Sequence, residues 1–480
     1  MTDETIAGEQ TGFGRIGRWI GLVLGPLLAL SVQLVSPPPE LSAEAWWVVS
    51  LALLMVTWWV TEAIPIPATA LLPLVVLPVS GATSIREAAA PYADPIIFLF
   101  IGGFILAAAV ERWHLHERIA LSIAAQAGGR PAALVAGFMI ASALLSMWIS
   151  NTATTLMLTP IAIGAACALN ADGKPDLALG GALVLGVAHA ATIGGVGTPV
   201  GTPTNLIGIG FLERAGEDIS FIEWMSRALP MMLVMLPLAW LFLSLPVFGR
   251  KHDAAEAVAR AVRDALAKLG RVTGPELRIA GVFGCVALAW MFRPMLNELP
   301  GLAGLSDPVI AILGALSLFL IPSGRGEGEA LMNWRAAERI HWGIVILFGG
   351  GLALAAGMES TGLAQWIGDW IGGLDGLSTL TLIAILVVVT ILVSELASNV
   401  ATLTSMLPVL AAVGAATDAP LLPRAFPLAI AASFAFMLPV ATAPNAIAYS
   451  SGVLTLKRML SVGIGLNIAA AILIISTAAL

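Results

Sequence analysis

The stretch Ser146-Met-Trp-Ile-Ser-Asn-Thr-Ala-Thr154 recurs later in the chain as Ser394-Glu-Leu-Ala-Ser-Asn-Val-Ala-Thr402, offset by 248 residues. Both copies lie inside long apolar regions, where clustered hydroxyl and amide side chains are costly unless they are used. The same offset relates Phe100 to Phe348, well outside the motif. These matches predict an internal duplication with a polar motif at the middle of an apolar region in each half.

A second shared element follows each motif. Gly201-Thr-Pro-Thr-Asn205 corresponds to Ala441-Thr-Ala-Pro-Asn445 at an offset of 240 residues. The apolar segments that contain them carry Gly and Pro runs at 194–203 and 438–444. Because Pro lacks a backbone donor and Gly loosens the helix, each segment is expected to unwind there. Matching broken helices in two membrane repeats are typical of secondary transporters whose site lies at the repeat interface.

Composition places the chain among multispanning membrane proteins. Its 480 residues are 58% hydrophobic and 11% charged, and the mean hydropathy is +0.94. The net charge of −7 and the absence of a basic arm give no indication of nucleic-acid binding. Cys167 and Cys285 both lie in apolar segments, so neither a disulfide nor a metal site is expected. Residues 1–17 lack an apolar core before a cleavage site, so no removable signal peptide is predicted.

A spanning helix needs about 20 apolar residues. Eleven segments meet this requirement: 18–36, 44–62, 65–82, 95–112, 181–210, 227–248, 277–293, 308–322, 342–368, 425–452 and 459–479. Two further apolar stretches, 131–169 and 377–415, carry the repeated motifs at their middles. Each stretch can be read as two spans joined by a tight turn, or as a re-entrant hairpin whose tip reaches the middle of the membrane.

Charge bias predicts the orientation. With a cytoplasmic N-terminus and two hairpins, eighteen of the 23 Lys and Arg residues lie on the cytoplasmic side, as the positive-inside rule requires. Five spans then separate the two motifs, so the halves have opposite orientation, which is an inverted repeat. The one long charged stretch, 249–276, is expected to form an amphipathic helix on the cytoplasmic surface.

The polar residues of the motifs suit ions. Hard cations such as Na⁺ require several oxygen ligands, which hydroxyls, amides and freed backbone carbonyls supply, while helix N-termini suit anions. Neither motif contains Lys or Arg, so an anionic substrate has to be balanced by bound cations and helix dipoles. Glu395 has no acidic counterpart in the first motif, and we favour a hairpin-stabilising role for it over a role as a ligand. His189 is interpreted as a core histidine.

An enzymatic function is not expected. His116-Glu117 is followed by Ala120, so the zinc-protease spacing H-E-x-x-H fails, and there is no G-x-S-x-G motif. A duplicated set of hydroxyls and amides is also unlike a single catalytic dyad.

At these residues the chain resembles the divalent-anion/sodium symporter family, which includes bacterial dicarboxylate and citrate carriers. The resemblance covers essentially the whole chain and is most specific at the two Ser-Asn tips and at Phe436-Met-Leu-Pro-Val-Ala-Thr442. It implies an all-α membrane protein of about 11 transmembrane helices and two re-entrant hairpins, with a scaffold domain and a transport domain that moves as an elevator. It also implies a homodimer in the cytoplasmic (inner) membrane.

The implied domain boundaries follow the repeat. They are a cytoplasmic tail (1–17), scaffold helices of repeat one (18–130), the first transport-domain segment (131–248), the cytoplasmic linker (249–276), scaffold helices of repeat two (277–376) and the second transport-domain segment (377–480).

The resemblance also implies the site residues. One sodium ion would be bound by Ser146, Ser150, Asn151 and Gly201, and a second by Ser394, Ala397, Asn399 and Ala441. The substrate carboxylates would meet Asn151, Thr152, Thr202, Ser398, Asn399 and Thr442.

Two positions depart from the family pattern. Val400 stands where many members have threonine, and Ala443 where many have proline. The expected function is sodium-coupled import of C4 dicarboxylates such as succinate, malate and fumarate. The alternatives are a sodium-independent dicarboxylate exchanger and a citrate or sulfate symporter.

Overall fold

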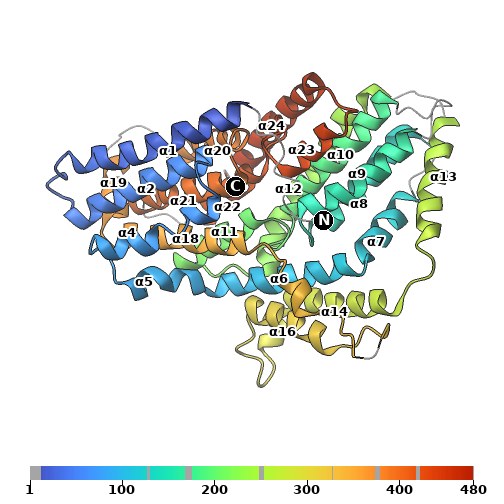
Figure 1. Ribbon diagram of the computed structural model, residues 1–480, viewed down its shortest axis with the longest axis horizontal. Helices are drawn as coiled ribbons and strands as arrows, with labels where there is room; N and C mark the ends of the chain where they lie inside the picture. Colours follow the sequence, from blue (N-terminus) through green and yellow to red (C-terminus); the bar gives the residue numbers. More distant parts are fainter. Residues whose placement is uncertain are drawn as a thin grey trace. The chain divides into compact units, whose positions relative to one another are not determined.

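The computed structural model describes residues 12–126, 130–167, 176–247, 253–326, 328–372, 379–417 and 422–478. Within them the regular structure is helical, apart from one isolated β-bridge between Pro322 and Ala330. The all-α prediction is therefore confirmed for these residues (Figure 1).

The helices of the first half are α1 (Gly12–Gln33), α2 (Ala43–Thr61), α3 (Ile66–Thr69), α4 (Pro73–Val79), α5 (Ile85–Ala89), η2 (Ala90–Ala93), α6 (Pro95–Arg112), α7 (Leu115–Ala124), α8 (Pro131–Ser146), α9 (Asn151–Cys167), α10 (Leu177–Gly195), α11 (Pro203–Arg214), α12 (Phe221–Ser244) and η3 (Leu245–Val247). Those of the second half are α13 (Asp253–Lys268), α14 (Gly274–Met291), α15 (Arg293–Asn297), α16 (Asp307–Leu320), α17 (Trp334–Ala337), α18 (Trp342–Ser360), α19 (Leu363–Gly372), α20 (Thr379–Ser394), α21 (Asn399–Thr417), α22 (Leu422–Ser433), α23 (Ala443–Ser450) and α24 (Leu456–Ala478).

Six helical segments of the described residues are long and apolar enough to cross a membrane: Ala43–Thr61, Ile85–Arg112, Leu177–Gly195, Phe221–Ser244, Trp342–Ser360 and Leu456–Ala478. Two predicted spans are wrong as continuous helices. The span 65–82 is divided into α3 and α4, each with a proline in its first turn, where proline is favoured. The span 342–368 is divided at Gly362, whose φ of +72° ends α18 before α19 begins.

The duplication is visible in the helix boundaries. Helices α8 and α20 begin and end at positions 248 residues apart, and so do α7 and α19. Helices α9 and α21 begin at the corresponding residues Asn151 and Asn399. At the offset of 240, α11 and α23 both begin directly after a threonine N-cap. The two halves therefore share their local structure as well as their sequence motifs.

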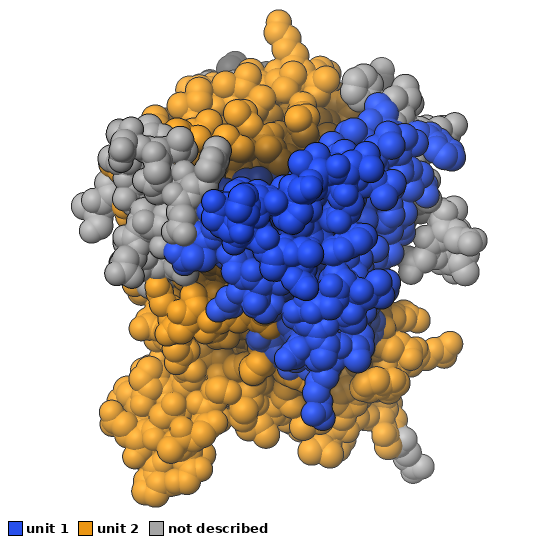
Figure 2. All heavy atoms as spheres, turned by 90° about the vertical axis from the view of Figure 1, so that its left-hand side faces the viewer, with its two compact units in different colours: residues 1–94, 342–378, 400–421 blue, residues 95–341, 379–399, 422–480 orange. Residues whose placement is uncertain are grey.

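The chain packs as two compact units (Figure 2). Unit 1 comprises residues 1–94, 342–378 and 400–421, of which 1–11, 373–378 and 418–421 lie outside the described residues. Its core includes the buried side chains of Trp59, Met55 and Leu354. Helix α18 approaches the α3 region closely: a Cβ on Gly350 would lie 2.2 Å from the carbonyl oxygen of Ala70.

Unit 2 comprises residues 95–341, 379–399 and 422–480 and contains both hairpin turns. Helix α10 lies at its centre, since all its residues from Leu179 to Gly195 are buried. It packs against α8 and α9, beside which Figure 1 shows it, and also against α12 and α23. A Cβ on Gly194 would lie 2.2 Å from the carbonyl oxygen of Ala143, so glycine allows α10 to approach α8. Because α23 packs on α9 and α10, the two repeats meet in this unit.

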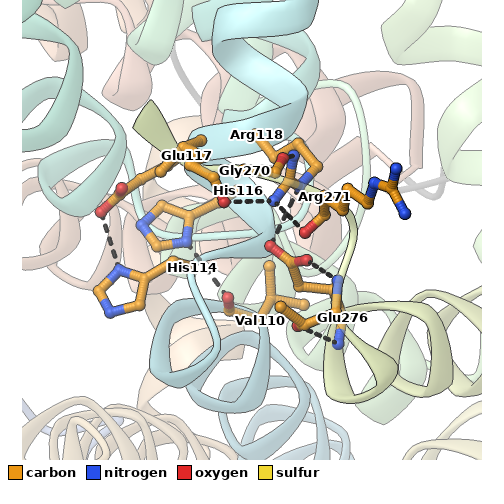
Figure 3. Close-up of polar contacts among 10 residues, drawn as sticks. Val110, His114, His116, Glu117, Arg118, Gly270, Arg271 and Glu276 are labelled. Carbon is orange, nitrogen blue, oxygen red and sulfur yellow. Dashed lines mark hydrogen bonds and ion pairs between the residues drawn. The ribbon is translucent and has the colours of Figure 1, made fainter. Parts of the chain in front are cut away.

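Within the predicted amphipathic stretch, residues 253–268 form α13, residues 269–273 form a loop and residues 274–276 begin α14, while residues 249–252 lie outside the described residues. Arg118 of α7 connects to the loop after α13 (Figure 3). It donates to the Glu276 carboxylate, with Nε 3.1 Å from Oε1, and to the carbonyl of Gly270 at 2.9 Å. Glu276 also accepts a hydrogen bond from the backbone N–H of Thr273 at 2.6 Å, which caps α14. Charge-assisted bonds of this kind hold α7 to the start of α14.

His116 and Glu117, which fail the zinc-protease spacing, have structural contacts instead (Figure 3). His116 is buried with Nδ1 3.2 Å from the carbonyl oxygen of Val110, and burial lowers its pKa, so the ring is neutral at pH 7 and donates this bond. Glu117 pairs with the exposed ring of His114 at 2.9 Å.

Candidate functional site

The first motif forms the turn between α8 and α9. Helix α8 ends at Ser146, and α9 begins at Asn151. The Ser146 hydroxyl donates to the side-chain oxygen of Asn151 at 2.6 Å, across the turn. Ser150 accepts a hydrogen bond at 3.1 Å from the backbone N–H of Ala153, as an N-cap residue does. The turn is therefore held by its own polar side chains.

The first helix break covers residues 196–202, between α10 and α11. Asn205 bridges it: its side-chain nitrogen donates to the carbonyl of Gly195 at 2.9 Å and to that of Thr198 at 2.7 Å. The Thr198 hydroxyl in turn donates to the carbonyl of Met147, which joins the break to the hairpin turn. Two carbonyls freed by unwinding are thus satisfied by a side chain of the same segment.

Several oxygens converge beside Gly201. A Cβ built on Gly201 would lie 2.4 Å from the carbonyl oxygen of Gly195 and 3.0 Å from the carbonyl oxygens of Ser146 and Met147. A Cβ built on Gly195 would lie 2.4 Å from the side-chain oxygen of Asn151. The structure therefore brings Ser146, Asn151 and Gly201 together. An all-oxygen set without a carboxylate fits a hard monovalent cation.

The second break, residues 434–442, repeats the first. The side-chain nitrogen of Asn445 donates to the carbonyls of Ala435 at 3.0 Å and Leu438 at 3.1 Å, each 240 residues after its counterpart in the first break. The side-chain oxygens of Asn205 and Asn445 are both buried and have no hydrogen-bond partner within the described residues. From the sequence, no role was assigned to these two asparagines. Their recurrence at equivalent positions shortly after a proline could have indicated one.

The second hairpin tip has open acceptors. The hydroxyl of Ser394 and the side-chain oxygen of Asn399 are buried and lack a hydrogen-bond partner among the residues that the structure describes. The side-chain nitrogen of Asn399 donates to the carbonyl of Ser433 at 3.3 Å. The Ser433 hydroxyl lies 2.5 Å from that of Thr204, which connects the second half to the first break. Buried acceptors of this kind cost free energy unless a ligand or ion meets them. Sequence reasoning missed Ser433.

The predicted cation-binding serines and the predicted substrate-binding residues lie at opposite kinds of helix end. Ser146 and Ser394 end α8 and α20, where carbonyls are free and the dipole is negative. The predicted substrate residues lie at helix starts, where N–H groups and the positive end of the dipole suit an anion. These are Asn151 and Thr152 of α9, Ser398 and Asn399 at the start of α21, and the N-caps Thr202 of α11 and Thr442 of α23. Ala397 and Ala441 are buried and offer only backbone groups.

Glu395 stabilises the second break. Its carboxylate accepts hydrogen bonds from the backbone N–H groups of Met437 at 2.9 Å and Leu438 at 2.9 Å, and from the side chain of Asn467 at 2.6 Å. These donors occupy the buried carboxylate, and they favour the stabilising role over that of a cation ligand. His189 is fully buried against the ring of Phe436, at 5.1 Å between centroids.

Glu395→Gln is expected to destabilise the protein by about 1–3 kcal/mol, because the amide NH₂ group faces donors and leaves one of them unpaired. The measurement is the melting temperature of the detergent-purified protein. Glu117→Gln is the matched control, since Glu117 has one exposed histidine partner and such surface pairs are worth about 0–1 kcal/mol. An equal melting temperature for Glu395→Gln and the unaltered protein would contradict this role.

Comparison with known proteins agrees with this architecture. The chain is 39% identical over 469 residues to the sodium-dependent dicarboxylate transporter SdcS of Staphylococcus saprophyticus, covering 96% of this chain and 90% of that protein. It is 38% identical over 469 residues, with the same coverage, to SdcS of Staphylococcus aureus strain NCTC 8325. The solved structure of the Neisseria gonorrhoeae efflux pump MtrF has the same general fold, with a TM-score of 0.57 at 14% identity over 94% of this chain and 96% of that one.

The family profile described as "Sodium:sulfate symporter transmembrane region" matches residues 17–480. The match covers every described element that contributes to the tips and breaks. The chain is thus a multi-pass membrane transporter rather than an enzyme, and it belongs to the sodium:sulfate symporter family, the divalent-anion/sodium symporters.

Proposed function

We propose that this protein is a sodium-coupled symporter that imports C4 dicarboxylates such as succinate, malate and fumarate. The main support for the proposal is the arrangement of the helix ends. Groups of oxygen atoms without a carboxylate lie at helix C-termini, and polar residues lie at four helix N-termini, all in unit 2 or at its boundary. The names of the SdcS relatives support both the ion and the substrate class.

The electrostatics explain why sodium is needed. Neither tip nor break contains Lys or Arg, and a helix N-terminus contributes about half a charge. A dianion at membrane depth costs on the order of 2.5–3.5 kcal/mol or more per uncompensated charge. Two sodium ions, held by the Ser146, Asn151 and Gly201 set and by the Ser394 and Asn399 set, would supply the compensating charge. Sodium binds first in this scheme and orders the tips for the dicarboxylate.

The architecture we propose follows the inverted repeat. Residues 131–248 and 377–480 form the transport domain, with two re-entrant hairpins, and residues 18–130 and 277–376 form the scaffold. The transport domain moves as an elevator in a homodimer, within the cytoplasmic (inner) membrane and with the N-terminus cytoplasmic. The charge bias of the loops supports this orientation.

The decisive experiment is uptake of labelled succinate into proteoliposomes. Replacing external Na⁺ with choline is expected to abolish uptake. If more than two sodium ions accompany each dianion, an inside-negative potential is expected to accelerate uptake, because it adds about 2.3 kcal/mol per net charge per 100 mV. Undiminished succinate-for-succinate exchange in sodium-free buffer would reject the symporter in favour of an exchanger.

Substrate preference is predicted from Val400, which stands beside Asn399 and packs against the apolar core of unit 1. It offers no hydroxyl to a third carboxylate, and an unpaired polar group in a closed site costs about 1–3 kcal/mol. Malate is therefore expected to compete with labelled succinate about tenfold or more better than citrate, which corresponds to about 1.4 kcal/mol. Citrate or sulfate competing better than malate would reverse the assignment.

A further inference from the structure

A basic cavity lies beside the first hairpin tip. Its volume is about 490 Å³, and it is lined by residues of α6, α17 and the segment that follows α17. Ser150 of the hairpin turn belongs to the lining. The volume falls within the range of small-molecule sites and greatly exceeds that of a water molecule. The cavity therefore places a ligand-sized space next to a residue of the candidate sodium site.

The lining is positively charged. Arg112, Arg335 and Arg339 face one acidic residue, Glu111, which gives a formal charge of +2. Glu329, which does not belong to the lining, binds Nη2 of Arg112 at 2.8 Å and reduces the sum to +1. Within the described residues no ion pair engages Arg335 or Arg339. Both arginines are exposed and available to an anion.

A second observation points to a missing ligand. The Nη1 atom of Arg112 is buried and has no hydrogen-bond partner within the described residues. A buried guanidinium N–H without an acceptor is costly, and a carboxylate is the acceptor that guanidinium geometry fits best. Arg112 thus has one donor nitrogen bound to Glu329 and one left for an anion.

We propose that this cavity is a second, sodium-independent binding site for the dicarboxylate, through which the substrate passes between the hairpin tip and the water on the arginine side of the membrane. The inference rests on the proposed function for its ligand. Arg335 and Arg339 attract the dianion, and Arg112 binds one of its carboxylates. Ser150 lies where the cavity adjoins the sodium-dependent site. Charged walls of this kind raise the local concentration of an oppositely charged substrate.

The test uses a reporter cysteine in the full-length protein. Cys167→Ser and Cys285→Ser remove the native thiols, and Ala336→Cys places one in the cavity lining. The rate of modification by a neutral methanethiosulfonate reagent is measured in sodium-free buffer. Succinate at twice its dissociation constant is expected to slow the reaction about threefold. Succinamide, which has the same shape without charge, is expected to have no effect. Ala108→Cys in α6 is a second reporter in the lining.

Two variants decide whether the arginines are responsible. Arg335→Gln with Arg339→Gln is expected to abolish protection by succinate. Arg325→Gln is the matched control, because Arg325 lies over the Trp113 ring at 5.5 Å, as Arg112 does at 5.4 Å, but does not line the cavity. Protection should persist in this control and in Asn151→Ala, which lacks an oxygen ligand of the sodium site.

The outcomes separate this site from the proposed function. Three results would each overturn the cavity proposal. They are no protection by succinate when all three arginines are present, protection by succinamide, and protection by succinate that persists in the double arginine variant. Loss of sodium-driven uptake in the unaltered protein would overturn the proposed function alone, since the cysteine assay requires no transport. A further expected result is sidedness: the double arginine variant raises the KM for succinate about tenfold on the arginine side only.

Discussion

Gly201→Ala is expected to reduce sodium-dependent succinate uptake at least about a hundredfold, which corresponds to about 2.8 kcal/mol of lost sodium binding. The added Cβ would lie 2.4 Å from the carbonyl oxygen of Gly195 and 3.0 Å from those of Ser146 and Met147. Ser146 and Gly201 belong to the set that we assign to the first cation, so the methyl group occupies the space of the ion or pushes its ligands apart. Overpacking of this kind costs about 1–3 kcal/mol in a rigid core.

Two controls isolate the effect. Gly164→Ala makes the same change in α9, where a Cβ would meet nothing within 4 Å, and it is expected to retain full uptake. Ala441→Gly changes the equivalent position of the second half, which already accommodates a methyl group, and should cost only about 1 kcal/mol.

The melting temperature separates site loss from misfolding. Sodium stabilises the native protein by mass action if it binds only the folded state. Gly201→Ala should still melt cooperatively in choline buffer but show a reduced increase when Na⁺ is added. Normal uptake by Gly201→Ala would remove this glycine from the cation site.

Asn151→Ala and Asn399→Ala are each expected to lower uptake to about 1% of the unaltered protein or less, equivalent to about 2.8 kcal/mol. Each asparagine begins the second helix of a hairpin, and in the proposed function it serves a cation and a carboxylate together. Loss of the Asn151 side chain also leaves the Ser146 hydroxyl without the acceptor that it contacts at 2.6 Å. An unsatisfied buried donor costs about 1–3 kcal/mol by itself.

The aspartate variants separate the two roles of these residues. Asn151→Asp and Asn399→Asp keep a side-chain oxygen for the cation but place a negative charge beside the dianion. Stabilisation by sodium should therefore survive, while succinate uptake is lost through like-charge repulsion. Wild-type uptake by Asn399→Ala would show that the second tip does not take part in transport.

Much of the fold could be predicted because the same motifs occur in both halves of the sequence. The motif at Ser146–Thr154 and its copy predicted two tips, and the Gly and Pro runs predicted two helix breaks, all of which the structure contains. Helix termination at Gly and Pro is a local effect of backbone sterics and missing donors, so a short stretch of sequence is sufficient to predict it. The continuity of segments such as 342–368 was harder to judge, because a single glycine at positive φ ends a helix without changing its apolar character.

The sequence by itself determined the helical class, the duplication, the positions of the tips and breaks, and the absence of Lys and Arg from the site, because each depends on residue type and spacing along the chain. Only the tertiary structure decided which oxygens meet. The carbonyls around Gly201 come from two separate helices, the backbone donors to Glu395 lie 42 and 43 residues away, and Thr204 meets Ser433 across 229 residues. Every residue carries the same backbone carbonyl group. The meeting of particular carbonyls therefore cannot be predicted from composition or spacing, because it depends on how the helices pack.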